Sequence, residues 1–261
     1  MRRFKFFLLL FFFLKGDDLG ERVAQTFSHL LKISHLQPAK IGIYLYSLDE
    51  GKIIFAHNER KSFLPASNQK LFVSACALEI WDEKFKRILS SKIKKRKFLK
   101  RHNLFLEINS KSNNYLANLT FWAIGRYKKT SPQWAIKSYL KRHNLPTTGL
   151  LLVDGSGRSR KNRATPFAII KLLNFLYHSP WKDDFLGSLA VAGKRGTLKR
   201  RLLSLRGCVY AKTGSLYGVK TLSGYLFSPR GNFSFSILIN DRKEGFSNWD
   251  FMEKLLSSLK D

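Results

Sequence analysis

The chain has 261 residues, of which 44% are hydrophobic, and its formal net charge is +29. This apolar content is enough to bury a sizeable core without disulfides or metals, and it excludes a fibre and a disordered chain. We therefore expect one domain, and the positive charge raises the question of an anionic partner.

The first predicted element is a short apolar run at the N-terminus. Arg2, Arg3 and Lys5 precede an apolar stretch at 6–14, which is too short to cross a bilayer, since about 20 residues are needed. A basic start and a short apolar run are typical of a secretory signal peptide. We expect residues 1–16 to be a signal peptide or short anchor, and the protein to be exported to the periplasm or cell envelope. The alternative is a buried N-terminal strand or helix. Export would exclude nucleic acid as a partner.

From residue 17 onward, the pattern predicts a block of helices between two groups of strands. Helical periodicity indicates a helix at 18–33, and two β-rich runs at 41–48 and 52–56, split by Asp49-Glu50-Gly51, indicate a hairpin. Further elements are expected as helices at 68–81, 114–125, 132–143 and 166–178, strands at 208–213, 219–227 and 233–239, and a closing helix at 246–259. Ser131 and Thr165, each followed by Pro, are expected helix caps.

The hairpin and the late strands can share one antiparallel sheet if the chain returns to it after the helices. We therefore expect an α+β fold in a single two-lobed domain, residues 17–261. The helical lobe would cover about 66–205, with a cleft between sheet and helices.

The first motif with chemical potential is Ser67-Asn68-Gln69-Lys70. In so basic a chain the Ser-x-x-Lys spacing also occurs at Ser91, Ser138, Ser179 and Ser257. Only Ser67 starts a long apolar helix after a hairpin, where free N–H groups can stabilise an oxyanion. Lys70 lies one turn later on the same face. A lysine of ordinary pKa, about 10.4, is a poor base at neutral pH, and burial or a second cation would lower that pKa.

Two further motifs follow in order. Ser112-Asn113-Asn114 supplies a hydroxyl and an amide that can relay a proton and hold a carbonyl, although alone it is an ordinary helix cap. Lys212-Thr213-Gly214 alone is a strand ending in a turn, but Lys212 could be the second cation, and Gly214 leaves room for a substrate backbone. Ser-x-x-Lys, Ser-Asp-Asn and Lys-Thr-Gly form the motif set of penicillin-binding proteins and class A β-lactamases.

The residues around these motifs resemble peptidase family S13, the D-alanyl-D-alanine carboxypeptidases that are class C low-molecular-mass penicillin-binding proteins. The resembling segments are 43–51, 65–71, 111–117, 154–163, 192–198, 211–216 and 222–225. The resemblance implies the serine β-lactamase/DD-peptidase-like transpeptidase fold. It also implies a hydrolase without cofactor that cleaves D-Ala-D-Ala-type bonds of peptidoglycan peptides through an acyl-enzyme and is acylated by β-lactams.

The resemblance also implies residue roles. Those roles are Ser67 as nucleophile, Lys70 as base, Ser112 as proton relay, Asn114 as ligand of the substrate amide, Lys212 and Thr213 as carboxylate ligands, and the backbone N–H groups of Ser67 and Ser215 as the oxyanion hole. Gly214 would lie beside the substrate, and residues 154–163 would be structural.

The sequence departs from the family pattern between the first two motifs. Only 41 residues, Leu71 to Lys111, separate Lys70 from Ser112, where typical members carry large inserted domains. We therefore expect a short form without these domains. A second departure is Arg158, at a position where the family usually has an apolar residue. The basic run Lys84–Arg101 fills the gap, either as a solvated helix or loop or as a surface for anionic cell-wall polymers or membrane lipids.

Other functions remain as alternatives. These are a β-lactamase or esterase of the same fold, and a catalytically weak cell-wall-binding protein. Carboxypeptidase and endopeptidase activity are equally compatible with the motifs. Cys76, in an apolar stretch, is expected to be an inert core thiol, and a disulfide to Cys208 is left open. The spacing of Cys and His matches no zinc motif, so we expect no metal.

Overall fold

The computed structural model describes residues 18–34, 36–93, 96–241 and 248–260. Its centre is a six-stranded sheet in the order β2-β1-β6-β5-β4-β3. All neighbouring strands are antiparallel. The strands are β1 Ile41–Ser47, β2 Lys52–His57, β3 Ala190–Val191, β4 Val209–Leu216, β5 Val219–Ser228 and β6 Gly231–Ile239.

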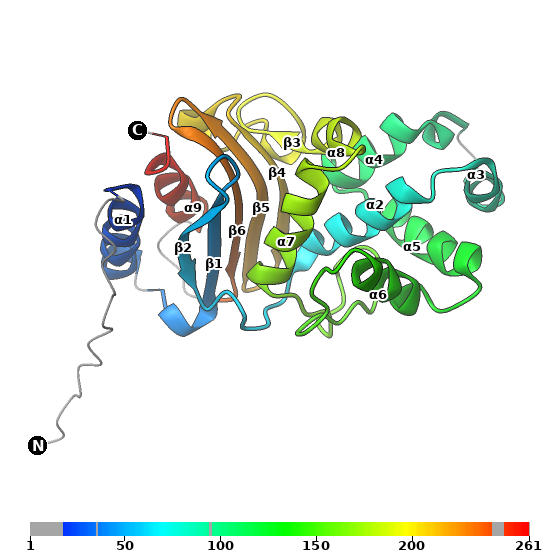
Figure 1. Ribbon diagram of the computed structural model, residues 1–261, viewed down its shortest axis with the longest axis horizontal. Coiled ribbons are helices and arrows are strands. Elements are labelled where there is room, and N and C mark those ends of the chain that lie inside the picture. The colour runs from blue at the N-terminus through cyan, green and yellow to red at the C-terminus, as the bar shows by residue number, and fades with distance from the viewer. Residues whose placement is uncertain (1–17, 35, 94–95, 242–247, 261) are drawn as a thin grey trace, which may run out of the picture.

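Helices cover both faces of this sheet (Figure 1). Within the described ranges they are α1 Asp18–Ser34, α2 Gln69–Glu79, α3 Glu83–Ser90, α4 Arg101–Asn109, α5 Asn114–Lys128, α6 Pro132–Arg142, α7 Pro166–Tyr177, α8 Lys182–Ser188 and α9 Asn248–Ser257. The terminal helices α1 and α9 lie on one face, and α2 to α8 form a helical lobe on the other (Figure 1). The expected α+β fold is therefore confirmed, and none of these helices is long and apolar enough to cross a membrane.

The expected elements agree closely with the observed ones. The hairpin, the caps at Ser131 and Thr165, and the return of the chain to the sheet are all present. The sequence missed β3, α4 and α8. For the basic segment it left a helix or a loop open, and α3 shows that part of this segment is helical. Residues 1–16, which were expected to be a leader, and residues 246–247 of the closing helix lie outside the described residues.

The basic segment is amphipathic. Asp82 begins α3 by accepting a hydrogen bond from the Phe85 backbone N–H at 2.7 Å. Phe85 and Leu89 are buried on the inner face of this helix, which leaves its Lys and Arg residues on the outer face. The apolar residues between the charges therefore anchor the segment to the helical lobe.

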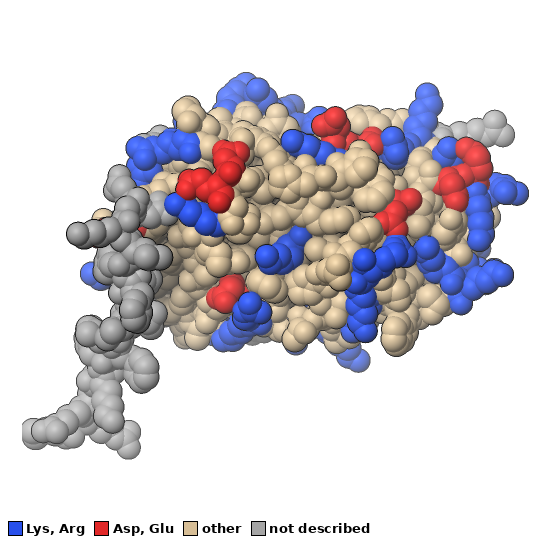
Figure 2. Space-filling view, in the orientation of Figure 1, with Lys and Arg blue, Asp and Glu red and all other residues tan. Residues whose placement is uncertain are grey.

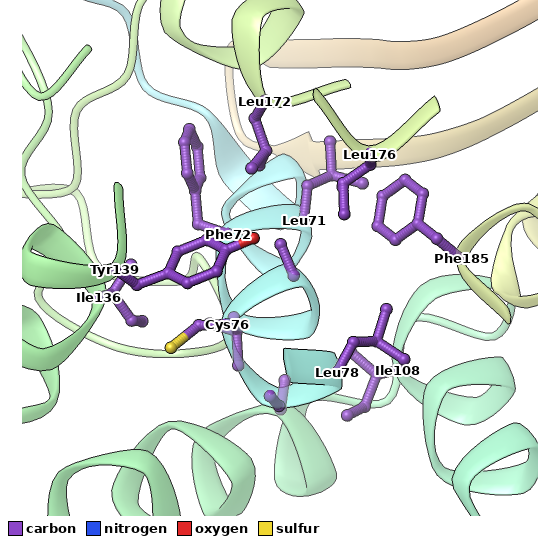
Figure 3. Packing of buried hydrophobic residues seen from close by; sticks show 14 of the residues in the cluster. Leu71, Phe72, Cys76, Leu78, Ile108, Ile136, Tyr139, Leu172, Leu176 and Phe185 are labelled. Carbon is purple, nitrogen blue, oxygen red and sulfur yellow. The ribbon is translucent and has the colours of Figure 1, made fainter. Parts of the chain in front are cut away.

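Helix α2 is the centre of the helical lobe. All ten residues from Gln69 to Leu78 are buried, and Leu71, Phe72 and Cys76 pack among side chains of α6 and α7 (Figure 3). A helix that is buried on every side is held rigidly by its neighbours. The chain just before it, which carries Ser67, is thereby placed at a fixed position beside the sheet.

Both cysteines are free thiols. Cys76 is 0% exposed, and burial raises the pKa of its thiol to about 12. The hydrophobic core has a second cluster on the side of the sheet covered by α1 and α9, and Cys208 packs against that cluster. Cys76 is therefore an inert core thiol, as expected from its apolar surroundings.

Candidate active site

Ser67 and Lys70 meet at the start of α2. Ser67 lies in a 3₁₀ turn, Ala66–Asn68, that leads directly into the helix. One helical turn later, Lys70 Nζ lies 2.8 Å from Ser67 Oγ. The spacing of three residues thus brings the amine to the hydroxyl, as the sequence predicted.

Lys70 is held by two further oxygen atoms. Its Nζ donates to Asn114 Oδ1 at 2.8 Å and to the Ser156 carbonyl at 2.6 Å. Lys70 is 0% exposed, and burial lowers its pKa to about 7, against the opposing charge of Asp154. A buried amine loses the water that stabilises its charge, so Lys70 can act as a base near neutral pH.

The Ser156 carbonyl is presented by a tightly bonded loop. Burial would raise the pKa of Asp154, but backbone N–H groups of Ser159 and Gly157 hold the pKa below its ordinary value. Those two N–H groups donate to the carboxylate at 2.7 and 2.5 Å. The contacts of Asp154 fit the structural role expected for this loop. That the Ser156 carbonyl would hold Lys70 was not predicted, because no sequence pattern marks a main-chain oxygen.

Lys212 is fully buried on β4. Its Nζ donates to the Thr213 carbonyl at 2.8 Å. Burial lowers the pKa of Lys212 well below its ordinary value, and the positive charge of Lys70 lowers it further. The sequence suggested that Lys212 would depress the pKa of Lys70. Burial is the cause of the lowered Lys70 pKa, and the repulsion seen on Lys212 acts on Lys70 in the same direction, because repulsion between two cations is mutual.

Thr197 joins two of the motifs and was missed as a site residue. Its hydroxyl accepts a hydrogen bond from Thr213 Oγ1 at 2.7 Å, and its backbone N–H donates to the Ser110 carbonyl at 3.0 Å. A Cβ on Gly196 would lie 2.2 Å from Ser110 Oγ, so only glycine allows this close approach. Gly196 and Thr197 thus link β4 to the chain that leads into Ser112. Both belong to the segment 192–198, which resembles the S13 family.

Gly214 allows β4 to pass next to Ser67. A Cβ at this position would lie 2.1 Å from Thr221 Oγ1 and 2.9 Å from the Ser67 backbone nitrogen. The next residue, Ser215, is exposed, and its Oγ accepts a hydrogen bond from Lys220 Nζ at 3.1 Å. The strand edge and the start of α2 therefore form two adjoining walls.

The middle motif contributes unequally. Asn113 begins α5 by accepting from the Leu116 N–H at 3.0 Å, and Asn114 contacts Lys70. Ser112 has a left-handed backbone, with φ of 60°, and within the described part of the chain its hydroxyl makes no hydrogen bond. Next to Asn114, Tyr115 Oη donates to the Lys92 carbonyl at 3.3 Å. The basic segment therefore lies beside the start of α5, where Asn114 is placed.

The structure joins Ser67, Lys70 and Asn114 directly and places Lys212 close enough to act on Lys70 electrostatically. Thr213 and Gly214 follow on the same strand. Among the described residues there is no group of three or more His, Cys, Asp or Glu side chains that could hold a metal. A buried lysine on a serine hydroxyl, at a helix start, is an arrangement suited to nucleophilic catalysis.

A family model and several relatives match the sequence of this chain. The model of the D-Ala-D-Ala carboxypeptidase 3 (S13) family matches residues 23–97 and 99–259. The D-alanyl-D-alanine carboxypeptidase of Actinomadura sp. (strain R39) is 36% identical over 141 residues, which are 49% of this chain and 26% of that protein. The D-alanyl-D-alanine carboxypeptidase DacB of Haemophilus influenzae is 32% identical over 163 residues, 58% of this chain and 33% of that protein. The alignments thus span 26% and 33% of these two relatives.

Solved structures show the same fold. Penicillin-binding protein 4 of Haemophilus influenzae, in complex with a β-lactam, has a TM-score of 0.72 at 17% identity and covers 88% of this chain and 97% of that one. The β-lactamase of Streptomyces albus G has a TM-score of 0.67 at 17% identity, with coverage of 93% and 98%. The fold is therefore common to penicillin-binding proteins and β-lactamases.

Proposed function

The chain belongs to the D-Ala-D-Ala carboxypeptidase 3 (S13) family, and on that basis we propose that it is a serine DD-peptidase that cleaves D-Ala-D-Ala-type bonds of peptidoglycan peptides. The observation that carries the proposal is the Lys70 Nζ to Ser67 Oγ contact of 2.8 Å, together with the lowered pKa of the buried amine. These are the features of an activated serine nucleophile.

In the proposed acylation step, neutral Lys70 takes the proton of the Ser67 hydroxyl while Oγ attacks the carbonyl carbon of the scissile bond. The resulting oxyanion accepts hydrogen bonds from the backbone N–H groups of Ser67 and Ser215. Collapse breaks the C–N bond, and the departing amine receives, through Ser112, the proton that Lys70 took from Ser67. Water then hydrolyses the acyl-enzyme, returning the Ser67 hydroxyl.

Substrate binding is assigned to β4 on one side and to Asn114, at the start of α5, on the other. Asn114 holds the peptide amide, and the substrate backbone runs along Gly214. The terminal carboxylate is bound by Lys212 and Thr213. Lys212 is fully buried, so an incoming carboxylate favours its charged form. A carboxylate therefore opposes the lowering of the Lys212 pKa by burial and by Lys70.

A β-lactamase of the same fold is the second candidate. Fast drug turnover in class A enzymes needs a carboxylate base for deacylation. Among the described residues, no Glu side chain contacts Ser67 or Lys70, and Asp154 is occupied by its own loop. This favours a long-lived penicillin adduct over rapid hydrolysis of the drug.

The test is incubation with labelled penicillin followed by intact-mass measurement, with Ser67→Ala as control. We expect one adduct per chain and none in the control. A protein that gains no adduct, under conditions that label a known penicillin-binding protein, contradicts the proposal. Rapid release of hydrolysed drug selects the β-lactamase instead. Cross-linked and uncross-linked peptide substrates distinguish endopeptidase from carboxypeptidase activity.

We also propose that the basic segment binds anionic polymers of the cell wall near the active site. This fits an exported protein with a signal peptide or short anchor at 1–16 and one catalytic domain at 17–261. The support is its position, since the Lys92 carbonyl bonds Tyr115 next to Asn114. Replacement of Lys84, Lys86 and Arg87 by Gln should lower salt-sensitive binding to cell-wall sacculi. Unchanged binding would show that the segment is only a solvated surface. A protein that binds sacculi but has no catalytic activity would instead be a cell-wall-binding protein.

A further inference from the structure

A hollow of about 530 Å³ lies outside the catalytic cleft, between the β1–β2 hairpin and one face of α7. The residues Lys171, Asn174 and Phe175 share that face, because their spacing follows the helical repeat, and His178 directly follows the end of α7. Pockets that bind small molecules usually measure about 300 to 1,000 Å³. Strands β6 and β5 separate β1 from β4, so the hollow is distinct from the cleft that contains Lys212.

Aromatic side chains form much of its wall. Tyr46 comes from β1, Phe175 from α7, and Trp181 from the residue before α8. The rings of Phe175 and Trp181 have centroids 6.3 Å apart, and the ring of His143 lies 4.5 Å from that of Phe175 at 38°. Rings from separate elements thus offer a surface for a flat apolar body.

Hydrogen-bond donors converge on the same hollow. Asn174 Oδ1 accepts from Ser234 Oγ at 2.5 Å, which orients the amide, and its Nδ2 makes no hydrogen bond within the described ranges. In that part of the chain, Lys171 makes no ion pair, and its Nζ lies 5.7 Å from the Phe167 ring centroid. Two donors, one of them charged, are therefore available to a ligand.

The carboxylates around the hollow already have partners. Glu79 binds both Arg142 and His143, and Glu50 pairs with Lys52 at 2.6 Å. Asp49 accepts from the backbone and side-chain N–H groups of Asn232 at 2.7 and 2.8 Å. The surface over α7, in the middle of Figure 2, is mostly uncharged. Among the described residues, no carboxylate lines the hollow and none forms an ion pair with Lys171.

We propose that this hollow binds a small organic carboxylate with a flat apolar ring. The ring packs against Phe175 and Trp181, while the carboxylate accepts hydrogen bonds from Lys171 Nζ and Asn174 Nδ2. Apolar area supplies affinity and the charge-assisted bonds supply selectivity for an anion. The site is independent of the DD-peptidase proposal, because it uses none of the cleft residues.

The test compares 2-naphthoate with its neutral isostere 2-naphthamide by calorimetry on the full chain. We expect naphthoate to bind about tenfold more tightly, as one partly exposed charged hydrogen bond provides. Lys171→Met should remove this preference, and Lys171→Arg should retain it. Lys199→Met removes the same charge from an exposed residue elsewhere and should leave the preference intact. Phe175→Leu should weaken both ligands equally.

Equal affinity for the two ligands, or no binding up to their solubility limits, overturns the proposal. So does an equal loss in Lys171→Met and Lys199→Met, because the effect would then reflect net charge. Lys212→Met should not alter naphthoate binding. If it does, the ligand occupies the catalytic cleft and the separate site is refuted, whatever the outcome of penicillin labelling.

Discussion

The titration of Lys70 should control acylation of Ser67. With a pKa of about 7, half of the Lys70 amines are neutral at pH 7, whereas the ordinary value of 10.5 leaves a far smaller fraction neutral. The gain in neutral amine is about a thousandfold. Because only the neutral amine accepts the Ser67 proton, burial of Lys70 should raise the acylation rate at pH 7 by the same factor.

The measurement is the acylation rate with a fluorescent penicillin in stopped flow, from pH 5 to pH 10. Lys70 is protonated below its pKa, so the rate should rise with pH through a midpoint near 7 and then reach a plateau. At pH 5 it should be about a hundredth of the plateau. Lys70→Arg keeps a fixed charge and should lower the rate at pH 7 by about a thousandfold or more.

Circular dichroism over the same pH range provides the control that the fold persists. A flat profile would refute the role of Lys70 as base. A midpoint near 10 would instead refute the effect of burial. A Lys70→Arg protein with the wild-type rate and midpoint would refute both.

Three further predictions concern residues around the active site. Lys212→Met should weaken penicillin binding and move the midpoint above 7, because the repulsion between Lys212 and Lys70 is lost; an unchanged midpoint would show that burial alone lowers the Lys70 pKa. Thr197→Val leaves buried Thr213 without its partner and should cost about 1 to 3 kcal/mol in denaturant unfolding, with Thr197→Ser restoring it. Gly157→Ala, at φ of 83°, should cost about 3 kcal/mol or more, whereas Gly187→Ala, with open space around it, should be neutral or stabilising; similar losses in both would contradict the steric argument.

The sequence by itself determined the elements and much of the site. Periodicity and capping residues act within a few residues of the chain, so the hairpin, the long helices and the strands after residue 208 could be located in advance. The Ser67 to Lys70 spacing is likewise a property of one helical turn. The short elements α8 and β3 were missed, because so few residues show no clear period.

The tertiary structure alone decided how distant segments act on each other. The Ser156 carbonyl on Lys70, the Thr197 hydroxyl on Thr213, and the hollow over α7 each join residues far apart in the chain. A main-chain oxygen or an ordinary threonine has no sequence pattern that marks it. The pKa of Lys70 depends on how completely its neighbours exclude water, and that is settled only when α2 is enclosed by the rest of the fold.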